Sequence, residues 1–144
     1  LANGKFMSTY CNFSVLLKDD DMDVAILKLD DEDFEYMYLP LASTTYKYTP
    51  LKDILMVGNL DEGELSKNVS LIEGKITSVN TVDARKSVFT DMPGTYGYSG
   101  SPVLDKNSKK VVGLFLGEVI QNNSSETIPC FTPVDDLWEL IDKA

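Results

Sequence analysis

Short apolar runs rich in β-branched residues recur along this chain and most constrain its fold. They occupy residues 24–29, 54–57 and 111–116, and turn-forming residues separate them. β-Branched side chains pack well on a pleated surface, and short apolar runs bounded by turn residues are typical of strands. We therefore expect an all-β protein.

One segment, residues 134–144, has the periodicity of a helix instead. The apolar residues that recur on one face of this helix are Val134, Leu137, Trp138 and Ile141. Thr132 is expected to cap the helix, and Pro133 suits its first position. With 144 residues, of which 43% are apolar, the chain is long enough for one domain or two small packed halves.

Residues 97–102, with the sequence Gly-Tyr-Ser-Gly-Ser-Pro, place a serine between two glycines. Glycine adopts positive φ at little cost and lets a substrate carbonyl approach the backbone. This is the local design of a serine nucleophile on a tight turn, in which Gly97 and Ser99 each offer a backbone amide to an oxyanion. An ordinary surface turn is the alternative, because glycine, serine and proline are common turn formers.

Asp23 stands at the start of the apolar run 24–29. An ionised carboxylate beside a buried strand is costly unless another group donates a hydrogen bond to it. In a catalytic triad that group is a histidine N–H. Asp23 and Ser99 are therefore the candidate catalytic residues.

The two motifs resemble two segments of the chymotrypsin-fold serine proteases and follow the same chain order. In that family an Asp-[Ile/Val]-Ala-[Ile/Leu]-Leu segment precedes a Gly-x-Ser-Gly-[Gly/Ser]-Pro segment. The chain is most similar to the HtrA-type branch, and the similarity covers nearly its whole length. The other segments that match in order are residues 3–5, 54–59, 69–79, 102–105, 111–114 and 128–135. The resemblance implies a chymotrypsin-like double β-barrel with a C-terminal α-helix.

The resemblance also implies a division of the chain. Residues 1–45 would hold the remaining strands of the N-terminal barrel, residues 46–133 the C-terminal barrel, and residues 134–144 the helix. The first barrel would be incomplete, and an incomplete barrel exposes unpaired strand edges. We therefore expect a partner, either the missing N-terminal fragment or another chain that completes the first barrel.

The sequence contains no histidine, the general base of the triad. In the resembled family the histidine precedes the aspartate, so we expect that this chain starts after the histidine-bearing segment and is nearly inert alone. The alternative is an inactive pseudoprotease that binds peptides or proteins, with Tyr10 or Cys11 in place of the histidine. Either residue lies too close to Asp23 for the intervening hairpin.

By resemblance, the substrate is a peptide or protein that pairs with the free edge of the strand at residues 114–118. The expected substrate-binding residues are Thr95, Leu116, Gly117 and Glu118. The substrate residue just before the scissile bond is called P1. The pocket for its side chain would be lined by Met92, Pro93, Gly94, Thr95 and Leu116. These residues carry no charge, which predicts a small or medium apolar P1 residue. If Glu118 points inward, a basic P1 residue is predicted instead.

The net charge of −10 disfavours nucleic-acid binding, which needs clustered lysine and arginine, and favours a cationic peptide or protein substrate. Val24 replaces the glycine that a calcium loop beginning at Asp19 requires, so no metal is expected. No cofactor is implied, and no apolar stretch is long enough to span a bilayer. Cys11 and Cys130 are expected to be small core residues, with a disulfide between them as the alternative.

Overall fold

The computed structural model describes residues 12–30, 37–58, 69–82, 84–94, 97–120 and 125–144. These residues fall into two compact units. One contains the described residues up to Tyr38 together with Leu140–Ala144, and the other contains Leu39–Glu139. The expected turn at residues 3–5 and the residues Tyr10 and Cys11 lie outside the described part of the chain, and the expected domain boundary after residue 45 stays a prediction.

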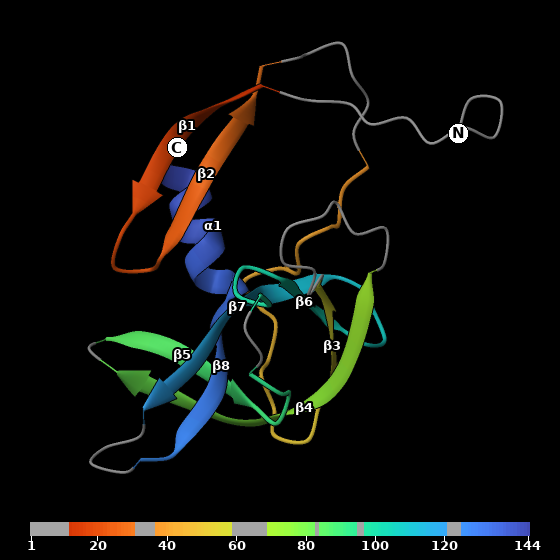
Figure 1. Cartoon of the computed structure of the whole chain (residues 1–144). Coiled ribbons are helices and arrows are strands. Elements are labelled where there is room, and N and C mark those ends of the chain that lie inside the picture. Colours follow the sequence, from red (N-terminus) through yellow and green to blue (C-terminus); the bar gives the residue numbers. More distant parts are fainter. Residues whose placement is uncertain (1–11, 31–36, 59–68, 83, 95–96, 121–124) are drawn as a thin grey trace, which may run out of the picture. The chain divides into compact units, whose positions relative to one another are not determined.

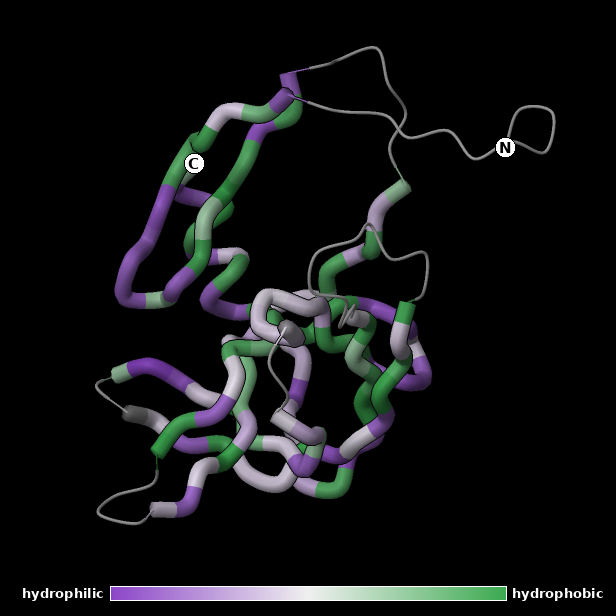
Figure 2. The backbone as a smooth tube through the Cα atoms, in the orientation of Figure 1, coloured by the Kyte–Doolittle hydropathy of each residue, from purple (hydrophilic) through white to green (hydrophobic). Residues whose placement is uncertain are grey.

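The first unit contains an antiparallel hairpin of β1 (Phe13–Asp19) and β2 (Val24–Leu29) (Figure 1). Its connecting turn is hydrophilic (Figure 2). The Asp19 carboxylate accepts a hydrogen bond from the Met22 amide at 2.9 Å, and this bond closes the turn. Asp23, the last residue of the turn, is exposed and has a φ of 55°. The expected aspartate thus lies directly before its predicted strand.

The second unit is a closed barrel with the strand order β3-β4-β5-β8-β7-β6. Its strands are β3 (Asp53–Gly58), β4 (Ser70–Val82), β5 (Arg85–Thr90), β6 (Pro102–Asp105), β7 (Val111–Ile120) and β8 (Thr127–Pro133). Strand β3 pairs with both β4 and β6 and so closes the barrel. One closed barrel, one partial sheet and a C-terminal helix confirm the expected chymotrypsin-like, mostly β architecture.

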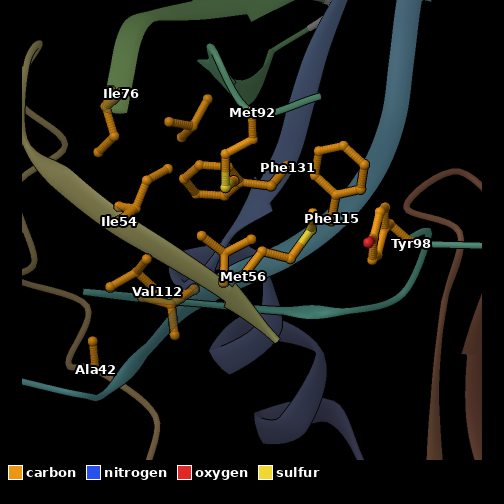
Figure 3. Packing of buried hydrophobic residues seen from close by; sticks show 12 residues of the cluster. Ala42, Ile54, Met56, Ile76, Met92, Tyr98, Val112, Phe115 and Phe131 are labelled. Carbon is orange, nitrogen blue, oxygen red and sulfur yellow. The ribbon is translucent and has the colours of Figure 1, made fainter. Parts of the chain in front are cut away.

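Large apolar side chains fill the interior of the barrel (Figure 3). Ile54 and Met56 alternate along β3 and are fully buried, while Phe115 and Phe131 come from the paired strands β7 and β8. Side chains of a small barrel fill its interior in this way, so that the barrel is a packed core and not a channel. The core includes Tyr98, which belongs to the turn that carries the candidate site.

Helix α1 (Val134–Lys143) begins directly after β8, and Thr132 is still part of that strand, where it pairs with Leu114. The Tyr48 hydroxyl accepts a hydrogen bond from the Val134 amide at 2.8 Å and so caps the helix. The expected cap from Thr132 is therefore replaced by a group 86 residues away in sequence. At ten residues, α1 is also too short to cross a membrane, and no other helix occurs among the described residues.

Candidate active site

Ser99 lies on an exposed turn between β5 and β6. Gly97 has a φ of 95° and Gly100 a φ of 86°, which are left-handed conformations that favour glycine. Tyr98, between Gly97 and Ser99, points the other way. It is 3% exposed and lies beside Phe115 in the core (Figure 3). The turn thus anchors its tyrosine in the barrel and presents its serine to solvent.

Backbone hydrogen bonds fix this turn to β7. The Gly100 amide donates to the Phe115 carbonyl at 2.7 Å, and the Phe115 amide donates to the Ser101 carbonyl at 2.9 Å. The Ser101 amide also donates to the Tyr98 carbonyl at 3.0 Å within the turn. Within the described residues, the amides of Gly97 and Ser99 have no backbone acceptor. Two of the turn's amides therefore hold it in place, whereas the two amides expected to bind an oxyanion make no such backbone bond to the described residues.

The Ser99 hydroxyl donates to the Leu116 carbonyl at 3.2 Å. The register of β7 with β8 shifts between Phe115 and Gly117, and Gly117 has a φ of 113°. A Cβ added to Gly117 would lie 3.4 Å from the Ser99 Oγ. The bulge therefore brings the expected substrate-binding residues Leu116 and Gly117 next to the expected nucleophile.

Glu118 extends from the same part of β7 across Gly94. A Cβ added to Gly94 would overlap the Cγ and Oε1 of Glu118, so only glycine leaves room for this side chain. Thr127 at the start of β8 donates a hydrogen bond from its hydroxyl to the other carboxylate oxygen, Oε2. Sequence reasoning missed Thr127, because its only sequence signal is a common hydroxyl at the end of a polar loop.

The remaining expected site residues lie elsewhere or are not described. Met92, a predicted wall of the P1 pocket, is fully buried in the barrel core. Thr95 lies outside the described residues. Asp23 belongs to the first unit and Ser99 to the second, so their pairing stays a prediction.

Gly58 at the end of β3 lies against two residues of the turn, Tyr98 and Ser101. A Cβ added to it would lie 2.5 Å from the Cδ1 of Tyr98 and 2.9 Å from the Oγ of Ser101. We expect Gly58→Ala to lower the free energy of unfolding by about 1 to 3 kcal/mol, since the Tyr98 ring must move out of a packed core. Urea denaturation would measure this loss. In a Tyr98→Leu background the same alanine should cost clearly less, and an equal cost in both backgrounds would refute the clash.

Cys130 is a free, buried thiol on β8. Burial raises its pKa to about 11, so it is protonated at neutral pH and is a poor nucleophile. It packs as a small core residue, as expected. The described residues contain no group of three or more histidine, cysteine, aspartate or glutamate side chains placed to hold a metal.

The chain is similar to known proteases. A family model described as a trypsin-like peptidase domain matches residues 2–114. Among solved structures, Deg5 has a TM-score of 0.66 at 18% sequence identity, over 88% of this chain and 57% of that one. The MamO protease domain from Magnetospirillum magneticum has a TM-score of 0.63 at 12% identity, over 88% and 66% of the two chains. This chain thus spans less than two thirds of either structure.

A search of curated proteins finds no match. The two structures share the fold, and the family model covers most of the chain, including the expected nucleophile segment. The expected similarity to chymotrypsin-fold proteases of the HtrA type is thereby confirmed for the fold. The chain belongs to the trypsin-like peptidase domain family.

Proposed function

We propose that Ser99 is the nucleophile of a serine endopeptidase, of which these residues supply the C-terminal portion. The observation that carries the proposal is the exposed Ser99 hydroxyl, which lies on a turn with two left-handed glycines, 3.2 Å from the Leu116 carbonyl. Nucleophilic serines of this family need such a turn, because the substrate carbonyl must reach both the hydroxyl and nearby backbone amides.

In the proposed reaction, the Ser99 Oγ attacks the peptide carbonyl and its proton passes to a histidine. The carbonyl oxygen becomes an oxyanion, which accepts hydrogen bonds from the amides of Gly97 and Ser99, each worth about 3 to 4 kcal/mol. The histidine then gives its proton to the leaving amine, and an acyl-enzyme on Ser99 remains for hydrolysis by water. No metal or cofactor is needed for these steps.

The histidine must come from outside these residues, since the sequence has none. We propose that Asp23 orients it by accepting a hydrogen bond from its N–H. The exposed position of Asp23 at the hairpin turn supports this role, because its carboxylate is open to a partner segment. That segment is the proposed partner of the chain, either its N-terminal fragment or another chain.

The edge of β7 is the proposed substrate-binding element. Strand β6 pairs with β7 only as far as Leu114, whereas β8 pairs with it from Gly113 to Ile120. Among the described residues, the β6 side of β7 beyond Leu114 therefore has no strand partner. An extended peptide can add to this edge beside Ser99 by main-chain hydrogen bonds.

A second candidate function is a peptide-binding module without catalysis. The absence of histidine from the sequence favours it. It would use the same strand edge and would leave Ser99 unreactive, so one experiment separates the two.

That experiment is fluorophosphonate labelling of the full-length protein that carries these residues. We expect covalent labelling at Ser99, found by intact and peptide mass, and none in Ser99→Ala. Ser101→Ala is the matched control, because this serine lies two residues away on the same turn but is buried, and it should label like the wild type. A folded wild-type protein that binds peptides but is not labelled would refute the endopeptidase and support the binding module.

A further inference from the structure

Glu118 directly follows, along β7, the residues that contact the proposed nucleophile. Glu118 directly follows Gly117, whose Cβ position is 3.4 Å from the Ser99 Oγ. It lies two residues beyond Leu116, whose carbonyl accepts the Ser99 hydrogen bond. An extended peptide that pairs with this edge of β7 at Ser99 would therefore run along the part of the strand that carries Glu118.

The direction of the side chain is fixed from two sides. Gly94, five residues before Ser99, leaves the space that the Cγ and Oε1 of Glu118 occupy. Thr127 donates a hydrogen bond to Oε2 from the neighbouring strand. One oxygen is thus held by Thr127 of the barrel, and the other lies beside Gly94.

The described part of the chain provides no cation that pairs with Glu118. No ion pair involving Glu118 occurs among the described residues, and its side chain is exposed. A carboxylate held in place but not paired binds a guanidinium or ammonium group through charge-assisted hydrogen bonds. An apolar side chain in the same place would gain no such bonds.

We propose that Glu118 selects substrates with a cationic side chain, lysine or arginine, at the position before the scissile bond. This inference rests on the proposed function, since it assigns specificity to the same site. The sequence left two predictions open, an apolar and a basic P1 residue, and this inference favours the basic one. Glu118 acts as a specificity residue that contacts the substrate side chain, with Thr127 as its positioning residue.

The test is binding of 4-aminobenzamidine, a fluorescent amidine, to the full-length protein, which requires no catalysis. We expect saturable binding in the wild type and a loss of affinity of about tenfold or more in Glu118→Gln, which keeps the shape and removes the charge. Glu126→Gln is the matched control, because it removes an exposed carboxylate beside Thr127 and should bind normally. Gly94→Ala should also weaken binding, because the added Cβ would overlap the Glu118 side chain and displace it.

The outcomes separate this inference from the proposed function. If Ser99 labels with fluorophosphonate but the wild type and Glu118→Gln bind the amidine equally, or neither binds it, the specificity role is wrong and the peptidase stands. If the amidine binds through Glu118 but Ser99 does not label, the cation site is real and belongs to a binding module.

Discussion

Phe115→Ala is expected to lower the free energy of unfolding by about 3 to 5 kcal/mol, the range for loss of a buried phenylalanine side chain. Phe115 is 1% exposed and is among the largest fully buried side chains of the barrel. Its ring packs beside Met56 and Tyr98 (Figure 3). The alanine would leave a cavity beside Tyr98, the residue that anchors the turn carrying Ser99, and a close-packed core fills such a cavity only in part.

The same substitution should affect Ser99. The Phe115 carbonyl accepts the Gly100 amide, and Tyr98, which anchors the turn, would lose its neighbour in the core. We expect labelling of Ser99 by fluorophosphonate to slow on the order of tenfold at a temperature where the variant is folded, because small displacements of reacting groups are costly. Urea denaturation and labelling rates measure the two effects.

Phe115→Leu is the control for this prediction. It keeps most of the buried volume and should cost only about 1 kcal/mol, with labelling close to that of the wild type. If Phe115→Ala were as stable as Phe115→Leu, the ring would not be a main support of the barrel. If the alanine variant lost stability but labelled at the wild-type rate, the turn would not depend on the core beneath it.

The strands and the tight turn that carries Ser99 were predictable because their signals are local. The runs at residues 24–29, 54–57 and 111–116 fall within β2, β3 and β7. The turn is predictable because the positive φ at Gly97 and Gly100 strongly favours glycine, which the sequence shows directly. These parts of the fold follow from the conformational preferences of a few neighbouring residues.

Contacts between distant segments were not predictable in this way. The Tyr48 hydroxyl caps α1 and the Thr127 hydroxyl holds Glu118, and neither tyrosine nor threonine carries a sequence signal for such a partner. Closure of the barrel brings these groups together, so they become visible only in three dimensions. The direction of Glu118 is the clearest case, since the sequence left both an apolar and a basic P1 residue open.

A buried carboxylate at the end of β6 should make the stability of the barrel depend on pH. The Asp105 Oδ1 accepts the amides of Asn107 and Ser108 at 2.9 and 2.8 Å. Its Oδ2 accepts the Tyr46 hydroxyl at 2.8 Å and lies 3.4 Å from the Lys52 Nζ. The Lys52 ammonium also lies 4.0 Å from the centre of the Tyr46 ring. Every oxygen of this carboxylate is therefore bound in its ionised form.

Burial by itself raises the pKa of Asp105, but the amide donors, the Tyr46 hydroxyl and the Lys52 charge outweigh it and lower the pKa to about 2. The ordinary value is 3.8, so the folded state holds the carboxylate ionised more strongly than the unfolded state does. The resulting stabilisation is fully present above about pH 4 and is lost as the pH falls through 2. One pKa unit corresponds to about 1.4 kcal/mol, so the effect amounts to about 2 kcal/mol.

Asp105→Asn is expected to lower the free energy of unfolding by about 2 to 3 kcal/mol near neutral pH, since it removes the charge and leaves donors without an acceptor. Urea denaturation at about pH 6 and about pH 2 should show the gap between wild type and variant shrinking by about 2 kcal/mol. Asp53→Asn is the control, because the pair of Asp53 with Lys75 is exposed and such pairs contribute little. If the gap for Asp105→Asn were the same at both pH values, the carboxylate would stabilise the barrel by shape and hydrogen bonding and not by its charge.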